Sequence, residues 1–241
     1  MRVEPTVLNG AQYGQLPSTL SLLCWNLHKQ SPLDPVVGEW LERVNWISDL
    51  MLFQEAAWQE PFSLDKWQRY DVAAVANLKW QERHYGVMNL SLAKVLDAEG
   101  YLSMHREMGW TTRKGALFCR YRVDGSVLLT VNVHMLNFHH DVAYEDELAR
   151  LQYLLERYEG ALILAGDFNT WNRKRTLLLK TMCRRLKLRH VAVKGVRRFG
   201  RYALDHLFYR GVRMVDASVL QTHRLSDHHP IRVHFMMPRS V

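Results

Sequence analysis

The chain has 241 residues, of which 48% are hydrophobic, and it carries a formal net charge of +8 at pH 7. This length and composition suit one large α/β domain with a full hydrophobic core. No stretch approaches the roughly 20 apolar residues of a membrane span, and three cysteines without CxxC spacing argue against a disulfide framework or a zinc site. With no export signal at the amino terminus, we expect a cytoplasmic protein.

The first segment of the chain lacks hydrophobic periodicity. Residues 1–19 contain prolines and glycines between isolated apolar residues. This pattern predicts a loose leader, followed by a single domain over residues 20–241.

Five apolar runs then adjoin short polar motifs. The runs are LSLLCW, DLMLF, VLLTVNV, ALILA and HPIRVHF, and the motifs beside them are Asn26, Gln54-Glu55, His134, Gly166-Asp167-Phe168-Asn169 and Ser226-Asp227-His228. If the runs are buried strands, the polar residues converge at one edge of the sheets, where α/β folds usually form ligand sites. Carboxylate and amide oxygens suit a hard divalent ion, and imidazoles beside them suit proton transfer. The pattern predicts metal-assisted phosphoester hydrolysis.

Between these motifs lie a hairpin and a helix. The segment GALFCRYRVDGSVLLTVNV predicts two strands joined by a turn at Asp124-Gly125. Apolar residues recur at helical spacing over residues 141–160, with Asp141 as the expected cap and Gly160 as the expected end. Strand pairs mixed with helical crossovers suit two packed mixed sheets with helices outside.

The order and wording of the motifs resemble the endonuclease/exonuclease/phosphatase superfamily, from about Ser21 to Phe235. WNLHKQ, AGDFNTWNRKR, LDHLFYRG and LSDHHP are most similar to its bacterial YafD-like branch. The resemblance implies a DNase I-like, four-layer α/β/β/α sandwich of two mixed β-sheets and a metal-dependent phosphodiester hydrolase.

The resemblance also implies a metal site. Glu55 is expected to be the principal metal carboxylate, with Asn26 and Asp227 close to the same ion. Mg²⁺ is the expected cofactor, and Mn²⁺ is the alternative.

Catalytic roles follow from the same resemblance. Asp167 and Asn169 are expected to handle the attacking water and the scissile phosphate. His228 is expected to lie against the phosphate, with Asp205 behind it to fix the tautomer. His134 can donate to the phosphate or protonate the leaving oxygen.

Two features point to different subfamilies. The resemblance places His134 where AP endonucleases have tyrosine, whereas DNase I and the sphingomyelinases have histidine. Asn137 and the HYGV segment within residues 83–87 are instead similar to the exonuclease III group. The chain therefore mixes the two patterns.

Positive charge is concentrated between two of the motifs. Residues 168–204 contain no Asp or Glu and hold twelve of the 32 Lys and Arg residues. Aromatic and amide side chains are interleaved with them, as in surfaces that hold a nucleic-acid backbone and stack its bases. The residues expected to bind substrate are Asn137, Trp171, Arg173, Arg197, Arg198, Arg201 and Tyr202. The alternatives are a basic helix over residues 175–190 that packs its leucines inward, and a membrane surface of anionic headgroups.

The leading hypothesis is a magnesium-dependent nuclease that acts on DNA or RNA by in-line attack of an activated water. The alternative is a phosphatase or phosphodiesterase that acts on a phospholipid headgroup, a sugar phosphate or a small nucleotide. A nucleic-acid binder that has lost catalysis is disfavoured because the ligand set is complete. The sequence identifies no protein partner.

Overall fold

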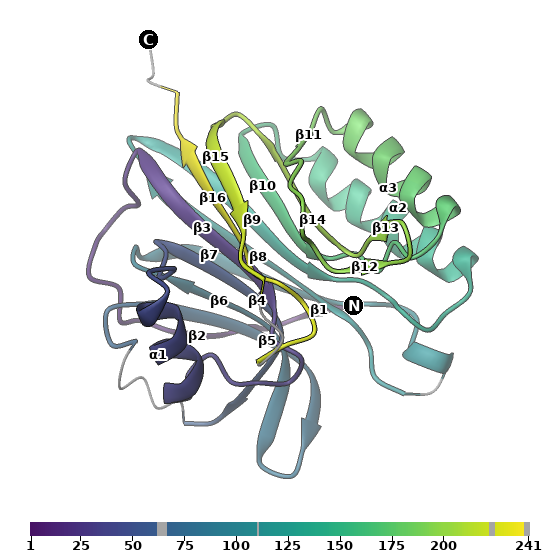
Figure 1. Cartoon of the computed structure of the whole chain (residues 1–241), viewed down its shortest axis with the longest axis horizontal. Coiled ribbons are helices and arrows are strands. Elements are labelled where there is room, and N and C mark those ends of the chain that lie inside the picture. Colours follow the sequence, from purple (N-terminus) through teal and green to yellow (C-terminus); the bar gives the residue numbers. More distant parts are fainter. Residues whose placement is uncertain (62–66, 110, 222–224, 239–241) are drawn as a thin grey trace.

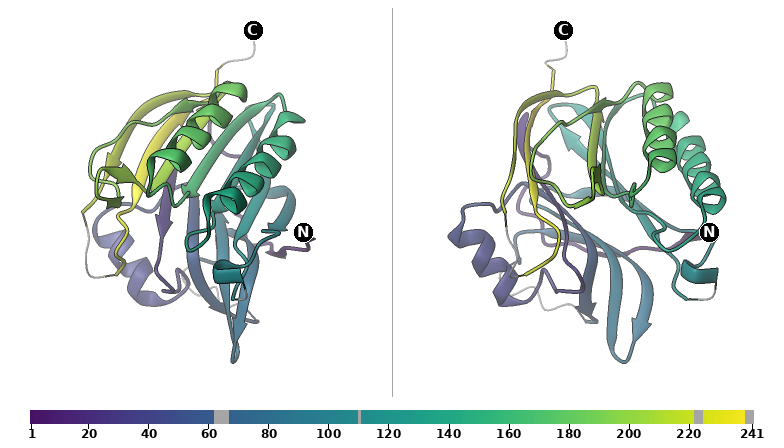
Figure 2. Two further views of the ribbon diagram at one scale, coloured as in Figure 1. Left: turned by 90° about the vertical axis from the view of Figure 1, so that its right-hand side faces the viewer. Right: turned by 45° about the vertical axis from the view of Figure 1, so that its right-hand side comes forward.

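The computed structural model describes residues 1–61, 67–109, 111–221 and 225–238. Two mixed β-sheets pack face to face, and helices cover their outer faces (Figures 1 and 2). The four-layer α/β/β/α sandwich expected from the sequence is therefore confirmed. Within the described ranges, no helix is long and apolar enough to cross a membrane.

Within the described residues, each large sheet has seven strands, named below in the order in which they lie side by side. The first sheet contains β1 (Arg2–Val3), β7 (Val95–Leu102), β8 (Gly115–Val123), β9 (Ser126–His134), β10 (Ala161–Asp167), β14 (Asp205–Arg210) and β11 (Arg189–His190). The second contains β15 (Arg213–Val219), β16 (Ile231–Met236), β3 (Thr19–Asn26), β4 (Leu50–Gln59), β6 (Arg83–Ser91), β5 (Asp71–Trp80) and β2 (Thr6–Leu8). A small separate hairpin pairs β12 (Arg198–Phe199) with β13 (Tyr202–Ala203).

The helices join or follow the central strands. α1 (Pro35–Arg43) connects β3 to β4 and packs on the second sheet, while α2 (Asp141–Glu156) and α3 (Arg173–Arg185) cover the first. A short 3₁₀ helix spans Glu107–Gly109. α1 and α2 are crossovers between parallel neighbours: β3 pairs in parallel with β4, and β9 pairs in parallel with β10.

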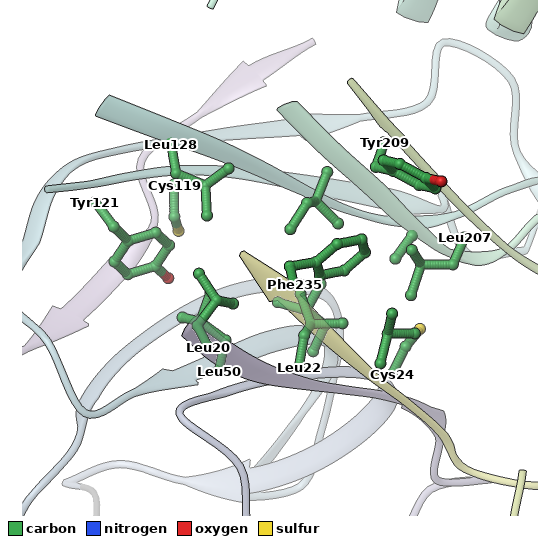
Figure 3. Close-up of a cluster of buried hydrophobic side chains, with 14 of the residues drawn as sticks. Leu20, Leu22, Cys24, Leu50, Cys119, Tyr121, Leu128, Leu207, Tyr209 and Phe235 are labelled. Atoms are coloured by element: carbon green, nitrogen blue, oxygen red, sulfur yellow. The ribbon is translucent and has the colours of Figure 1, made fainter. Parts of the chain in front are cut away.

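Three hydrophobic layers hold the sandwich together. Leu22 of β3, Cys119 of β8 and Phe235 of β16 meet in the layer between the two sheets (Figure 3). The second layer lies between the first sheet and helices α2 and α3, and the third lies between the second sheet and α1. Since both sheets are covered on both faces, the central strands are apolar along most of their length.

The ends of the two parallel pairs position the site. In the first sheet Asp167 is the register partner of His134, and in the second Asn26 is the register partner of Gln54. Polar residues thus stand where each parallel pairing ends, and β4 continues beyond its pairing to Gln59. The predicted turn between β8 and β9 is also present, with Asp124 and Gly125 both at positive φ.

The structure differs from the expected leader and helix ends. Residues 1–19 are not a loose leader, because β1 pairs with β7 and β2 pairs with β5. Strands this short leave no detectable periodicity. α2 is capped by His140, whose side chain accepts a hydrogen bond from Ala143 N, and it ends at Glu156 before reaching Gly160. Asp141 is the first helical residue, and its carboxylate bonds to α3.

Candidate functional site

Glu55 lies at an irregularity of β4. The pairing of β4 with β6 shifts register between Phe53 and Ala56, and Glu55 has a φ of +48°. This left-handed conformation is strained for glutamate and is typical of a bulge that redirects a side chain at a functional site. Next to it, the buried Gln54 donates from Nε2 to Asn132 Oδ1 of the other sheet over 2.6 Å. This hydrogen bond links the residue before Glu55 to β9 of the other sheet.

Asp167 is the centre of the polar cluster. Its Oδ2 accepts a hydrogen bond from Asn26 Nδ2 at 3.0 Å, and it lies 3.5 Å from His134 Nε2 and 3.9 Å from His228 Nε2. Its Oδ1 accepts from Asn169 N at 3.0 Å. Burial raises the pKa of Asp167 to about 6, although the charge of His228 opposes the shift. A cation placed beside this carboxylate would favour its ionised form.

His228 and Asp205 form a buried pair. His228 Nδ1 lies 2.9 Å from Asp205 Oδ2, and the backbone N of His228 donates to Ser226 Oγ. Burial lowers the pKa of His228, but the charge and hydrogen bond of Asp205, followed by the charge of Asp167, outweigh it and raise the pKa to about 9. At neutral pH the imidazole is therefore a cation that presents Nε2 toward Asp167.

His134 is held in the opposite protonation state. Lys114 Nζ lies 3.0 Å from His134 Nε2, and Glu55 Oε1 lies 3.8 Å from the same nitrogen. Burial, followed by the charges of Lys114 and His228, lowers the pKa of His134 well below its usual value. The neutral ring accepts from the Lys114 ammonium. Sequence reasoning missed Lys114, since a lysine before a strand carries no distinctive signal.

The charge and donor atoms of the cluster fit a divalent cation. The carboxylates of Glu55, Asp167 and Asp205 exceed the two cations, Lys114 and protonated His228. Among the described residues, Asp167, Asp205 and His228 place one ligand atom each within 4.8 Å of one another. Because His228 and Asp205 already bond to each other, the oxygen donors that could hold a cation are those of Glu55, Asn26 and Asp167, each of which keeps a free lone pair.

Asp227 is more exposed than the other residues of the cluster, but its Oδ1 is buried. Its Oδ2 is 3.2 Å from Arg197 Nη2, its Oδ1 is 3.3 Å from His28 Nδ1, and its side chain is 42% exposed. The backbone N of His28 in turn donates to Asn26 Oδ1 over 3.0 Å. Asp227 is therefore linked to Asn26 through His28, and its charge also acts on the neighbouring His228.

The aromatic residues of the basic segment lie beside Asn169. Trp171 Nε1 donates to Asn137 O, and the Trp171 ring centroid is 6.4 Å from that of Phe199 on the β12–β13 hairpin. The hairpin is anchored because Thr170 Oγ1 donates to the carbonyl of Ala203 over 2.6 Å. Arg201 lies over the ring of Tyr202 on the same hairpin, which also bears Arg198. These residues form a basic aromatic wall beside the cluster.

Two arginines of the basic run lie elsewhere. Arg173 lines a groove between α2 and α3, away from the cluster. Arg175 is completely buried, so the interpretation of all twelve basic residues as a surface for a polyanion is wrong at this position. Its guanidinium bonds to carbonyls of the loops that hold Asn169 and His139.

The chain is similar to known proteins over most of its length. Residues 23–228 match the model of the Endonuclease/Exonuclease/phosphatase family. A UPF0294 protein of Yersinia enterocolitica is 34% identical over 239 residues, which cover 91% of this chain and 85% of that protein.

Solved structures share the fold at low identity. The endonuclease/exonuclease/phosphatase of Bacteroides vulgatus superposes with a TM-score of 0.68 at 15% identity, over 91% of this chain and 99% of the other. A mannosyl-6-phosphatase of Bacteroides thetaiotaomicron gives a TM-score of 0.62 at 15% identity, over 90% of this chain and 100% of the other.

Proposed function

This chain belongs to the Endonuclease/Exonuclease/phosphatase family, and from that membership and the geometry of the site we propose that it is a metal-dependent phosphodiester hydrolase that cleaves DNA or RNA. The observation that carries the proposal is the surroundings of Asp167 Oδ2. Asn26, His134 and His228 all lie within 3.9 Å of that oxygen, and Glu55 adjoins His134. Such a cluster can hold a phosphate ester, a water and a cation side by side.

Mg²⁺ is the cofactor that we propose, with Mn²⁺ as the alternative, and Glu55, Asn26 and Asp167 would hold it. Oxygen donors of this kind suit hard cations rather than zinc. When bound, the ion would neutralise charge that develops on the phosphoryl oxygens. Asp227 stays a proposed ligand of the same ion, because its Oδ1 is buried and His28, which lies beside it, donates from its backbone N to Asn26 Oδ1.

The protein side chains supply the remaining steps. Asp167 would orient the attacking water and remove its proton. His228, which Asp205 keeps charged, would donate from Nε2 to a phosphoryl oxygen. The amide of Asn169 donates to Met135 O over 3.0 Å, so one N–H of its Nδ2 remains to contact the ester. Lys114 adds a second fixed positive charge beside His134.

The basic aromatic wall supports nucleic acid as the substrate. Arg197, Arg198 and Arg201 would contact phosphates that flank the scissile one, and Trp171 and Tyr202 offer faces for stacking. Three buried cysteines that form no disulfide suit the cytoplasm, which we propose as the compartment.

A second candidate is a phosphatase or phosphodiesterase for a sugar phosphate, a phospholipid headgroup or a small nucleotide. The similar fold of a mannosyl-6-phosphatase supports it, as does the histidine at position 134. The two candidates differ in salt dependence, because several phosphate contacts make binding fall steeply with added salt whereas one anionic group does not.

The test is a substrate panel assayed with Mg²⁺ and with EDTA. It includes single-stranded, double-stranded and abasic DNA, RNA, sugar phosphates and bis(p-nitrophenyl) phosphate, each with wild type, Glu55→Gln and the exposed control Glu159→Gln. We expect cleavage of nucleic acid that EDTA and Glu55→Gln abolish and Glu159→Gln retains. Cleavage of the small esters alone would favour the second candidate, and metal-independent cleavage would overturn both.

A further inference from the structure

A pocket opens beside the catalytic cluster on the side of the β5–β6 hairpin. Its volume is about 320 Å³. Three residues of the catalytic cluster also line this pocket, namely Glu55, Lys114 and His134. The hairpin projects at the lower end of the molecule in Figure 1 and in both views of Figure 2. A ligand in the pocket would therefore touch the groups that surround the proposed phosphate position.

One wall of the pocket is apolar and aromatic. Leu78 is the register partner of Tyr85, and Trp80, two residues after Leu78, points to the same face of the strand. Trp80 is 63% exposed. The polar Lys79, which alternates with Leu78 and Trp80, does not line the pocket. The hairpin therefore presents flat rings to the pocket, and a burial role does not explain Trp80.

Polar groups line the other side. Asn77 Nδ2 donates to Arg113 O over 2.6 Å, which fixes the amide plane and leaves Oδ1 as an acceptor. Thr112 and Lys29 complete this side, and Lys114 lies at the boundary with the cluster. A ring with donor and acceptor edges matches this combination better than an acyl chain does.

The backbone under the pocket is fixed by close packing. A Cβ at Gly86, which lines the pocket, would lie 2.0 Å from Val75 O, so β5 and β6 approach too closely there for any side chain. The pairing of the two strands shifts register between Ala76 and Leu78, and this irregularity places Asn77 at the pocket. Close packing and the register shift of the hairpin therefore fix the shape of this pocket wall.

We propose that this pocket binds the nucleobase and sugar of the one nucleotide whose phosphate lies at the catalytic cluster. The proposal rests on the proposed function and specifies its substrate. A volume of about 320 Å³ is at the low end of ligand pockets, which holds one nucleoside and not a base pair. A base must leave its stack to enter such a pocket. The substrates are therefore strand ends, unpaired nucleotides or mononucleotide esters, and paired bases within a duplex are disfavoured.

The test is equilibrium binding, which does not require turnover. Isothermal titration calorimetry in Ca²⁺ compares the 5′- and 3′-monophosphates of the four nucleosides with ribose 5-phosphate. Wild type is compared with Trp80→Ala, Trp80→Phe and the control Tyr153→Ala, which removes an exposed aromatic residue from α2. Trp80 is exposed, so its replacement should leave the fold intact. The same proteins are titrated with vesicles of phosphatidylcholine and phosphatidylglycerol.

We expect at least one nucleotide to bind about tenfold more tightly than ribose 5-phosphate, because a base that stacks on the Trp80 ring adds a contact that the sugar phosphate lacks. Trp80→Ala should abolish this preference, whereas Trp80→Phe and Tyr153→Ala should retain it. Equal affinity for nucleotide and sugar phosphate, or a preference that survives Trp80→Ala, would overturn the pocket even if the enzyme cuts nucleic acid. Vesicle binding that depends on Trp80, without nucleotide preference, would assign the hairpin to a lipid surface instead. Nucleotide preference in a protein that cleaves nothing would refute only the proposed reaction.

Discussion

Arg175→Met is expected to destabilise the protein by about 4 kcal/mol. The guanidinium is completely buried, and it donates to Leu136 O at 2.9 Å, Asn169 O at 3.2 Å and His139 O at 2.6 Å. It also donates from Nε to the Asp141 carboxylate at 3.2 Å. Leaving the three buried carbonyls without this donor costs about 1–3 kcal/mol each, whereas the Asp141 carboxylate, which is 29% exposed, keeps Asn172 as a partner.

The aromatic contacts make lysine a poor substitute. The guanidinium carbon lies 4.4 Å from the Tyr144 ring centroid and 4.5 Å from that of Trp171. Lysine keeps the charge but cannot span these carbonyls with a planar fork, so we expect Arg175→Lys to cost about 2 kcal/mol. Because Arg175 holds the Asn169 carbonyl, this variant should also lower kcat more than it raises KM.

The assay is equilibrium unfolding in urea, followed by circular dichroism, with thermal melts of the same proteins. A loss of about 4 kcal/mol corresponds to a fall of roughly 8–16 °C in Tm for a domain of this size. Arg185→Met is the matched control, since Arg185 is an exposed residue of α3, and it should change stability by less than about 0.5 kcal/mol. If Arg175→Met stayed within 1 kcal/mol of wild type, the assigned structural role of this arginine would be wrong.

Three further predictions concern strand β10 before the site, the buried pair of His228 and Asp205, and three arginines in and beside the basic aromatic wall. Gly166→Ala should cost about 3 kcal/mol or more in urea unfolding, because its Cβ would lie 1.9 Å from Val133 O at a φ of +144°; a cost below 1 kcal/mol would contradict the packing. Asp205→Asn should move the alkaline limb of the pH–rate profile to lower pH, because burial lowers the pKa of His228 and the Asp205 carboxylate raises it. If the limb stayed at the same pH, deprotonation of His228 would not be its cause. Replacement of Arg197, Arg198 and Arg201 by serine should weaken nucleic-acid binding and reduce the slope of log K against log salt by about 2–3. Unchanged affinity at low salt would show that these three arginines do not contact the substrate.

The sequence predicted the layered fold because each central strand is an apolar run and each run adjoins a polar motif. The grouping of His134 and Asp167 follows from the same logic, since they end neighbouring parallel strands of one sheet, and the packing of the two sheets brings Asn26 beside them. Lys114 and Arg175 could not be placed this way. Their positions depend on contacts between segments 20 and 39 residues apart, and no local pattern encodes such contacts.

Helix ends and short strands escaped prediction for a different reason. Asp141 is a good capping residue by type, but its carboxylate bonds to Asn172 and Arg175 of α3, and His140 takes the cap. Tertiary contacts override local preference at this helix end. Trp80 was not predicted to line a pocket because its neighbours in sequence are charged or polar, and only the pairing of β5 with β6 brings it beside Leu78 and Tyr85.

The first eight residues contain two short strands, β1 and β2, that cover sheet edges. β1 and β2 lie at the outer edges of the two sheets, beside the much longer strands β7 and β5. A chain shortened to begin at Ser18 would leave unpaired the backbone groups of residues 100–101 and 72–74, which β1 and β2 cover, and unpaired edges template pairing with other molecules. The two short strands protect part of these edges, so a shortened protein should gain a tendency to self-associate through β7 and β5.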